Sequence, residues 1–478
     1  MRTSTILLLL LLSRATQQQE FFPHTITLDG RLTGADHERL LEREFEVPPG
    51  TRRIEIEYAV SGADRRTVVD LGLRGPSGLR GWSGGGKRSI MVSALGATPG
   101  YLPGPIESGP WAVVLGIPNI RPGSEDTYTI TIRLFSADLP PASKVIRAGS
   151  GWFAGDLHAH SGHSDGRAVS KSGQTIPAPA HRVFDAASTA GLDFVALSDH
   201  NTASHWLDVD RLQPYYDSLL LLHGREVTTY RGHANTVGET AFSEFRLPTP
   251  ATSPAGLLGH IAGSGAFISI NHPLRPDDET CMGCGWNDGD AVTIQTVQGV
   301  EVVNGALRTG SLDGWSFWAR LLNRGHRLTA VGGSDEHTID APQDQNLGTP
   351  TTVVYARDLS EAGIVAGLKS GRVYIRTQGV GGPSLQFSAE WAGRVFEMGD
   401  TIPAGAPSAA TLQVEVTGSG AQTLEWIRSG EPLGTQSVSG GVQRRRVEMR
   451  DGDWFSVIIR DPAGQATVLS NAIYVRSK

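Results

Sequence analysis

Histidine, aspartate and glutamate residues gather in short motifs between residues 156 and 337 of this 478-residue chain. Nine of their side chains are candidate metal ligands: His158, His160, Asp165, His200, Glu226, His233, His272, Asp335 and His337. Because side chains alternate across a strand, the His-x-His pair at 158 and 160 and the Asp-x-His pair at 335 and 337 each place two ligands on one face. Imidazole nitrogen and carboxylate oxygen suit Zn²⁺, Mn²⁺ or Fe²⁺. The residue types and their spacing therefore predict a metalloenzyme.

Helices and strands are predicted to alternate through the region that carries these motifs. Three helix-then-strand pairs are indicated, at residues 179–190 with 194–197, 255–262 with 266–270, and 314–324 with 328–331. A ligand motif follows each of these strands. Strands that alternate with helices favour parallel βα units, and the C-terminal ends of the strands in a βα barrel meet at one mouth. Such a fold brings motifs from distant parts of the sequence together.

The regions on either side have a different pattern, in which apolar and polar residues alternate in short runs. Examples are residues 53–58 and 128–132 before the motifs and residues 411–416 after them. Turn clusters rich in Gly and Pro separate the runs, which is typical of antiparallel β-sandwiches. We therefore expect an N-terminal β-sandwich over residues 20–138, a linker at Leu139-Pro140-Pro141, a metal-binding domain over residues 150–378 and a C-terminal β-sandwich over residues 381–478.

The chain begins with the pattern of a secretory signal. Met1-Arg2 supplies a positive charge, residues 6–12 are all Ile or Leu, and polar residues follow up to Gln19. Because this apolar run is too short to span a bilayer, we expect a signal peptide over residues 1–19, a secreted or periplasmic protein, and no transmembrane anchor. Cys281 and Cys284 are too few for a disulfide framework or a four-cysteine zinc site. In an exported protein we expect them to form a local disulfide that staples a loop.

In their order along the chain, the motifs resemble the signature regions of the polymerase-and-histidinol-phosphatase (PHP) family of metal-dependent hydrolases. The matching segments are His158-Ala159-His160 with Asp165, Ser198-Asp199-His200, Asn271-His272-Pro273 and Gly333-Ser334-Asp335-Glu336-His337, with Glu226 and His233 between them. One such motif is a weak signal, but the full set in order is specific. Residues 81–85, 97–104, 228–235 and 281–286 further resemble an exported branch of the family that is named after carbaryl hydrolases.

This resemblance implies a distorted (βα)7 barrel that holds two or three divalent metal ions (Zn, Mn or Fe). It places His158, His160, Glu226 and Asp335 at the first metal, His233 and His272 at the second with Glu226 bridging, and Asp165, His200 and His337 at the third. Asp165 stands where other members often have histidine. The catalytic residues that it implies are Glu226, Asp335 and His337. A water held between two cations loses a proton near neutral pH and becomes the nucleophile, and His163 and His205 are candidate proton donors to the leaving group.

We therefore expect an exported multidomain protein, part α/β and part β, that hydrolyses a small molecule. The expected substrate is a phosphoester, with a phosphodiester favoured, or a carbamate or carboxylic ester. Few basic residues adjoin the motifs, which disfavours a highly charged phosphomonoester. The formal net charge of −7 and the absence of a basic stripe argue against nucleic acid as a structural partner. The alternative is a catalytically inactive, metal-stabilised binding protein of the cell envelope, and the intact ligand set argues against it.

Overall fold

The computed structural model describes residues 23–62, 66–138, 144–239, 242–246, 254–277, 279, 281, 283–287, 295–305, 312, 314–339, 347–405, 408–418, 421–438 and 441–476. The expected signal peptide (residues 1–19) and linker (residues 139–141) lie outside these residues. Within them, no helix combines the length and the apolar character needed to cross a membrane. The chain divides into two compact units: the first takes in residues up to 94 and Gly100–Ala137, and the second takes in Leu95–Pro99 and Asp138–Lys478.

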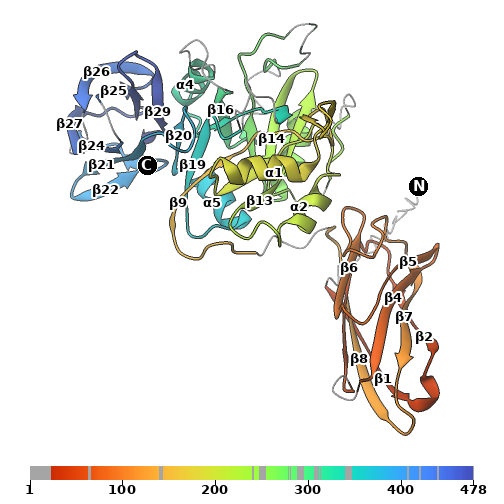
Figure 1. Ribbon diagram of the computed structural model, residues 1–478. Helices are drawn as coiled ribbons and strands as arrows, with labels where there is room; N and C mark the ends of the chain where they lie inside the picture. Colours follow the sequence, from red (N-terminus) through yellow and green to blue (C-terminus); the bar gives the residue numbers. More distant parts are fainter. Residues whose placement is uncertain are drawn as a thin grey trace, which may run out of the picture. The chain divides into compact units, whose positions relative to one another are not determined.

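The first unit consists of two four-stranded antiparallel sheets (Figure 1). One contains, in spatial order, β1 (His24–Thr33), β8 (Glu125–Phe135), β3 (Arg53–Val60) and β6 (Ser89–Ser93). The other contains β2 (Arg39–Val47), β7 (Gly109–Asn119), β4 (Val68–Gly75) and β5 (Gly78–Ser83), and the short 3-10 helix η1 (Gly34–Asp36) joins β1 to β2. The buried hydroxyl of Tyr58 in β3 donates to the carbonyl of Val69 in β4, which links the two sheets. The predicted strands at 53–58 and 128–132 are confirmed.

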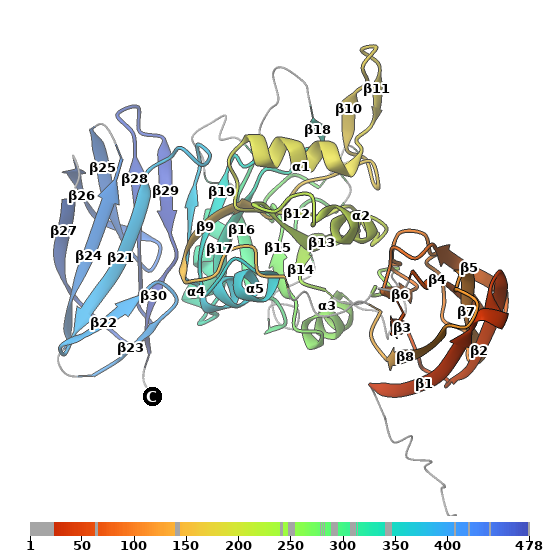
Figure 2. The ribbon, with the colours of Figure 1, turned by 60° about the horizontal axis from the view of Figure 1, so that its bottom comes forward.

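A continuous mixed sheet runs through the second unit (Figure 2). Its strands are, in spatial order, β17 (Thr329–Gly333), β16 (Gly299–Asn304), β15 (Phe267–Ile270), β14 (Gly232–Val237), β13 (Leu220–Thr229), β12 (Phe194–Leu197), β9 (Gly151–Asp156), β19 (Thr351–Ala356), β20 (Val373–Arg376), β29 (Ala466–Ser470), β28 (Trp454–Arg460), β25 (Gln422–Arg428) and β26 (Glu431–Val438). β30 (Ile473–Arg476) pairs with β28 and with β23 (Thr401–Pro403). A three-stranded sheet of β11 (Thr175–Pro177), β10 (Arg167–Val169) and β18 (Thr338–Ile339) stands apart from it.

Side chains join β17 to β19 and β20, where the long sheet has no backbone ladder. The hydroxyl of Thr352 in β19 donates to the carbonyl of Gly332 at 2.6 Å and accepts from its amide at 2.8 Å. Asn471, between β29 and β30, donates to the carbonyls of Ala330 in β17 and Val373 in β20, both at 2.9 Å, and accepts from the Ala330 amide at 2.7 Å. A side-chain amide both donates and accepts, so Asn471 substitutes for the missing backbone partner.

Helices cover the part of this sheet that precedes β20. The described α-helices are α1 (Ala180–Thr189), α2 (Trp206–Leu212), α3 (Pro254–Gly263), α4 (Trp315–Asn323) and α5 (Glu361–Ser370). α1, α3 and α4 are followed by β12, β15 and β17 respectively, so the three predicted helix–strand pairs are confirmed. The expected distorted (βα)7 barrel is not shown by the described residues, in which β14 runs antiparallel to both β13 and β15. Only two residues separate β13 from β14, which leaves no room for a helix between them.

The C-terminal strands share their core with the helix-covered region. A four-stranded sheet of β22 (Arg394–Glu397), β21 (Ser384–Trp391), β24 (Ala409–Thr417) and β27 (Gly441–Glu448) packs against β25 and β28 through buried apolar side chains. On the other side, the ring of Trp318 in α4 lies 5.2 Å from the ring of Trp454 in β28, edge to face. The expected domain boundary at residues 378–381 therefore falls inside one compact unit, and the division into three domains stays a prediction.

A buried ion-pair network in the second unit makes its stability depend on pH. The two ring nitrogens of His223 in β13 donate to Glu361 at 2.9 Å and to Asp210 at 3.2 Å. Burial alone would lower the pKa of His223, but the two carboxylates outweigh this effect and raise the pKa to about 10. The charged ring therefore contributes stability that is complete below the unfolded-state pKa of about 6.5 and that is lost as the pH rises through about 10.

We expect the substitution His223→Gln to lower the free energy of unfolding by ~2–3 kcal/mol near pH 6, because charge-assisted hydrogen bonds are lost. The difference from the wild type should shrink as the pH rises from about 7 to about 10. Urea unfolding followed by circular dichroism at several pH values measures this difference. A constant difference across the range would show that the ring stabilises the fold in its neutral form.

Candidate metal centre

Strands of the second unit deliver the predicted ligands to one edge of the sheet. β9, β12, β15 and β17 each end shortly before a ligand motif, which begins at His158, His200, His272 or Asp335. β9, β12 and β13 run parallel, and so do β15, β16 and β17. Because β14 is antiparallel to both β13 and β15, all six strands point the same way. Their C-terminal ends therefore lie together, which is how motifs far apart in the sequence meet.

The small sheet holds two further ligands in place. β10 follows the loop of Asp165 and pairs in parallel with β18, which directly follows His337. The Arg167 amide also donates to the His337 carbonyl at 2.7 Å. This pairing places Asp165 Oδ1 3.5 Å from His337 Nε2, so that two loops separated by more than 150 residues form one side of the site.

The buried carboxylate of Glu226 is the centre of the site. Its Oε2 atom lies 3.3 Å from His158 Nε2, 3.5 Å from His160 Nε2 and 3.0 Å from His200 Nδ1. Its Oε1 atom lies 3.1 Å from His233 Nδ1 and 3.4 Å from His272 Nε2, and accepts from the Asn271 amide at 2.9 Å. One carboxylate thus contacts five imidazoles through both of its oxygens, and its role as a bridge between two cations stays a prediction.

All nine predicted side chains belong to groups whose ligand atoms lie within 4.8 Å of one another. The groups are His158, His160 and Asp335; His158, Glu226 and His272; His160, Asp165, His200 and His337; and His233, His272 and Cys284. The structure therefore brings the predicted residues together, while their division among separate metal ions stays a prediction. Cys284 is bonded to Cys281, as expected from the sequence, so in this form its sulfur is not a thiolate and is a poor ligand.

Hydrogen bonds at the outer nitrogen of the rings set the orientation of three ligands. Nδ1 of His158 donates to Glu301 at 2.9 Å, Nδ1 of His272 donates to the Cys284 carbonyl at 3.0 Å, and Nδ1 of His337 donates to the Asp335 carbonyl at 2.8 Å. With the proton on Nδ1, the lone pair of each ring is on Nε2. Histidines that bind metals in proteins are typically held in this way.

Two buried ring nitrogens of the site, His160 Nδ1 and His233 Nε2, have no hydrogen-bond partner among the described residues. His158 Nε2 and Glu226 Oε2 form no hydrogen bond of normal geometry either, and contact each other only as an ion pair at 3.3 Å. Leaving such an atom unpaired costs ~1–3 kcal/mol, and most buried polar atoms in proteins are paired. Imidazole nitrogen and carboxylate oxygen are also the atoms that Zn²⁺, Mn²⁺ and Fe²⁺ take as ligands. The residues present therefore fit divalent metal ions.

Charged neighbours shift the titration of the central groups in opposite directions. Burial opposes charge on His158, but the carboxylates of Asp335, Glu301 and Glu226 outweigh it and hold the pKa of His158 well above its ordinary value. Burial would raise the pKa of the Glu226 carboxyl, but the charge of His158 and the hydrogen bonds from the imidazoles hold that pKa well below its usual range. A proton on His158 thus supplies the positive charge that a metal ion would bring, and this proton leaves when the ring binds metal.

Two ligand residues have backbone conformations that residues other than glycine rarely adopt. The φ angle is 25° at His272 and 54° at Asp335. Strain of this kind costs on the order of 1–3 kcal/mol per residue and is found mainly at functional sites. The packing beside Asp335 also depends on Gly333, where a Cβ atom would lie 2.3 Å from His158 Cβ and 2.6 Å from Glu301 Oε1. The local backbone is therefore shaped around the ligands.

Two residues of the site were not predicted from the sequence. Glu301 in β16 is 2% exposed; besides the His158 ring, it accepts the His272 amide at 2.9 Å and the Asn304 side chain at 3.0 Å. The sequence feature that could have revealed Glu301 is its position as the one acidic residue of an apolar strand, because a buried charge needs partners. Arg275 lies 2.9 Å from Asp335, Nη1 to Oδ2. It is three residues beyond His272 in a loop, where no pattern marks it.

Of the two candidate proton donors, His205 is excluded by its surroundings. It is fully buried, its Nε2 atom lies 2.8 Å from the Gly224 carbonyl, and burial lowers its pKa to about 4. His163 belongs to none of the ligand groups among the described residues. It is partly exposed and lies 2.8 Å from Asp208, whose hydrogen bond raises the pKa of His163. His163 stays a candidate.

Glu301 belongs to none of the ligand groups of the described residues, but it holds the ring of the ligand His158. Its substitution is therefore expected to weaken metal binding. We expect Glu301→Gln to weaken binding about 10- to 100-fold, as is typical when the partner of a metal-ligating histidine is lost. Glutamine keeps the size of the side chain and can still accept a hydrogen bond from the His158 ring, but it lacks the negative charge of glutamate. Competition with a chromophoric chelator measures the affinity. Unchanged affinity would mean that Glu301 only supports the fold.

Comparisons with known proteins give limited similarity. No protein-family model and no curated protein matches the chain. Among solved structures, a two-domain protein from Bacteroides vulgatus that contains a predicted PHP-like metal-dependent phosphoesterase is 18% identical, with a TM-score of 0.39, over 70% of this chain and 98% of that chain. A proposed metal-dependent phosphoesterase from Bifidobacterium adolescentis is 18% identical, with a TM-score of 0.29, over 40% of this chain and 90% of that chain. Because both TM-scores are below 0.5, the case for a metal centre rests on the side chains described above.

Proposed function

We propose that this chain is an exported, metal-dependent hydrolase of the PHP family that cleaves a small-molecule phosphoester, with a phosphodiester favoured. The observation that carries the proposal is the set of buried, unpartnered ligand atoms around Glu226. The order of the ligand motifs in the sequence supports the family. The Cys281–Cys284 disulfide supports a secreted or periplasmic location, because disulfides persist in oxidising compartments.

The proposed ligand sets differ in their access to solvent. His158 and Glu226 are fully buried, whereas the side chains of His200, His337 and Asp165 are 27%, 35% and 54% exposed. The group of Asp165, His200 and His337 therefore forms the open side, from which a substrate would approach. Divalent ions, when bound, supply Lewis-acid activation of water and of the substrate oxygen. Glu226 and Asp335 would hold these ions, and His337 would position the substrate at the open side.

Arg275 favours an anionic substrate. The sequence showed few basic residues beside the motifs, but the structure adds this guanidinium at the site. The side chain of Arg275 is 45% exposed. It lines a cavity of about 200 Å³ together with His272, Leu274, Pro276 and Asn304. A planar guanidinium matches two oxygens of a phosphate. A phosphodiester carries one negative charge, which a single arginine can balance.

We expect Arg275→Gln to lower kcat/KM for a phosphodiester about 10- to 100-fold, since a charge-assisted hydrogen bond contributes about 1.5–3 kcal/mol. An aryl N-methylcarbamate, which carries no negative charge, should be affected far less. Arg275→Lys is the matched control and should retain part of the phosphodiester activity. An equal loss with both substrates would mean that Arg275 supports Asp335 and does not recognise substrate.

The proposed function is tested by hydrolysis assays on purified protein reconstituted with Zn²⁺ or Mn²⁺. A phosphodiester, a phosphomonoester and an aryl N-methylcarbamate are compared in parallel. Preferential turnover of the phosphodiester is expected. Preferential turnover of the carbamate would keep the metal-dependent hydrolase but overturn the phosphoester proposal. Metal binding without turnover of any of the three would favour a binding protein.

A further inference from the structure

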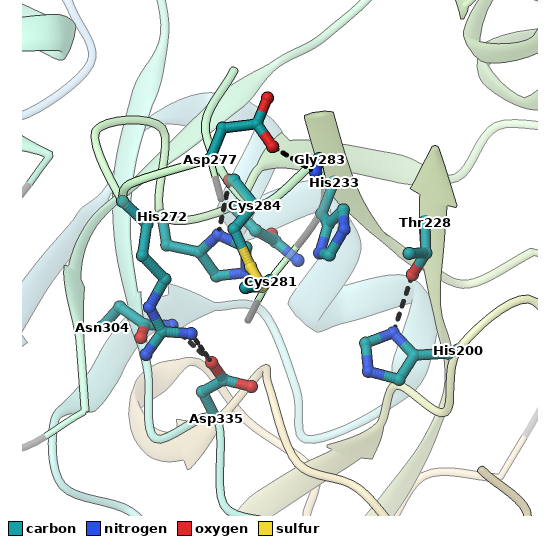
Figure 3. The surroundings of a disulfide bond; sticks show 12 residues. His200, Thr228, His233, His272, Asp277, Cys281, Gly283, Cys284, Asn304 and Asp335 are labelled. Carbon is teal, nitrogen blue, oxygen red and sulfur yellow. Dashed lines mark hydrogen bonds and ion pairs between the residues drawn. A yellow bond between two sulfur atoms is a disulfide. The ribbon is translucent and has the colours of Figure 1, made fainter. Parts of the chain in front are cut away.

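The disulfide lies directly against the proposed metal ligands (Figure 3). The sulfur of Cys284 and one ring nitrogen each of His233 and His272 lie within 4.8 Å of one another. Cys284 is 1% exposed and His233 and His272 are each 4% exposed. The Nε2 atom of His233 has no hydrogen-bond partner among the described residues. A buried sulfur, two imidazoles and an unpartnered nitrogen thus share one space.

Hydrogen bonds that do not involve the disulfide hold Cys284 in place. Its carbonyl accepts from the His272 ring, and the amide of Gly283 donates to Asp277 at 2.7 Å. The amide of Trp286 donates to the Pro273 carbonyl at 3.0 Å. Gly283 has a φ angle of 80°, and a Cβ atom on it would lie 2.1 Å from the Thr229 carbonyl oxygen. The loop therefore packs tightly on the ends of β13 and β15, and breaking the sulfur–sulfur bond leaves Cys284 beside the two histidines.

The chemistry of the Cys284 sulfur depends on its oxidation state. In the disulfide it carries no charge and binds metal weakly. As a thiolate it is a strong ligand for zinc, and sets of cysteine and histidine are common zinc sites. Two ligand atoms on a tetrahedral zinc ion lie roughly 3.6 Å apart, given Zn–N and Zn–S bonds of about 2.1 and 2.3 Å. The observed group is close enough for small side-chain movements to meet this spacing.

We propose that reduction of the Cys281–Cys284 disulfide makes Cys284 a fourth protein ligand, beside His233, His272 and Glu226, to the cation that these three residues would hold. The reductant is a dithiol: it transfers two electrons and two protons, becomes a disulfide itself, and leaves two cysteine thiols. Cys284 then loses its proton on binding the metal, while Cys281 stays a thiol. This inference rests on the proposed metal binding at His233 and His272, and makes the disulfide a redox switch of that site.

The switch has a direction. The oxidised form leaves a coordination position at this cation that the protein does not fill, and the reduced form fills it with sulfur. The reduced form should therefore bind zinc at least tenfold, about 1.4 kcal/mol, more tightly. It should also turn over substrate more slowly, because an open position is what catalytic zinc sites keep.

Cobalt binding tests the switch, because a thiolate bound to Co²⁺ gives an intense charge-transfer absorption in the near ultraviolet that imidazole and carboxylate do not give. Co²⁺ is added to four samples: the oxidised protein, the protein reduced with dithiothreitol and then desalted without oxygen, Cys281→Ser, and Cys284→Ser. Neither variant can form the disulfide, so any effect of losing it on folding is matched. Cys281→Ser needs no reductant, which excludes a complex between cobalt and dithiothreitol.

The absorption band is expected in the reduced protein and in Cys281→Ser, and is expected to be absent from the oxidised protein and from Cys284→Ser. Equilibrium dialysis of the same samples counts the bound Co²⁺. Binding of Co²⁺ without the band in Cys281→Ser would overturn the switch and leave the proposed function standing. Absence of Co²⁺ binding from all four samples would overturn the metal centre itself, and the switch with it.

Discussion

Glu226→Gln is expected to lower hydrolysis about 1,000-fold and to reduce the metal content of the protein. The substitution keeps the shape of the side chain but removes the negative charge that contacts five imidazoles, from His158 to His272. Without this negative charge, the repulsion between two cations at the site would no longer be offset, and they would bind more weakly. Activation by metal ions contributes several kcal/mol to catalysis, so their loss lowers the rate. Metal analysis by mass spectrometry and steady-state kinetics measure the two effects.

Glu336→Gln is the matched control for this experiment. Glu336 is also a buried carboxylate and lies between Asp335 and His337 in sequence, but it belongs to none of the ligand groups of the described residues. Its Oε1 atom accepts from the Thr338 amide instead. Metal content should be unchanged in this variant. If Glu226→Gln retained both full metal content and activity, the central role of that carboxylate would be wrong.

Removal of metal with a chelator is expected to abolish hydrolysis and to lower the melting temperature of the second unit. A ligand present at 100 times its Kd stabilises the folded protein by ~2.7 kcal/mol, which corresponds to several degrees in Tm. The shift should be larger at pH 8 than at pH 6. The proton that His158 holds through its raised pKa competes with metal, and this competition weakens as the pH rises.

Scanning calorimetry with and without chelator, at both pH values, measures this shift. The first unit is an internal control, because every ligand group of the described residues lies in the second unit. Its transition should not move. A chelator-induced shift that is larger at pH 6 than at pH 8 would mean that metal does not displace protons from the site.

The ligands were predictable because histidine and carboxylate residues recur in short motifs, and because His158, His200, His272 and Asp335 each come shortly after a strand. Strand polarity indicated that the motifs converge, whereas the assignment of His158, Glu226 and Asp335 to one site came from the family resemblance. The described residues do not show the expected distorted (βα)7 barrel, and the resemblance could not reveal that residues 230 and 231 form only a short turn between β13 and β14. The ligand motifs specify the residues of the site, but they do not specify whether a helix or a short turn connects two neighbouring strands.

Partners of the ligands were harder to predict than the ligands themselves. Glu301 and Arg275 act through contacts with residues distant in sequence, and such contacts leave no periodic pattern. The pairing of β20 with β29 is similar, because strand register between remote segments depends on tertiary packing. The sequence carried no prediction for Asn471, whose role depends on the gap between β17 and β20.

Asn471 lies near the C-terminal end of this sequence but holds a strand of the metal centre. A ribosome delivers this residue more than 300 residues after His158, and domains fold as their chain emerges. The first unit is complete long before that point, because it ends at Ala137. The strand that leads to Asp335 and His337 is held by β16 and by Thr352 of β19 before that point, but its direct link to β20 through Asn471 forms only once the C-terminal strands are present. If the proposed centre binds metal, we therefore expect a chain that lacks residues 466–476 to bind it more weakly than the full chain.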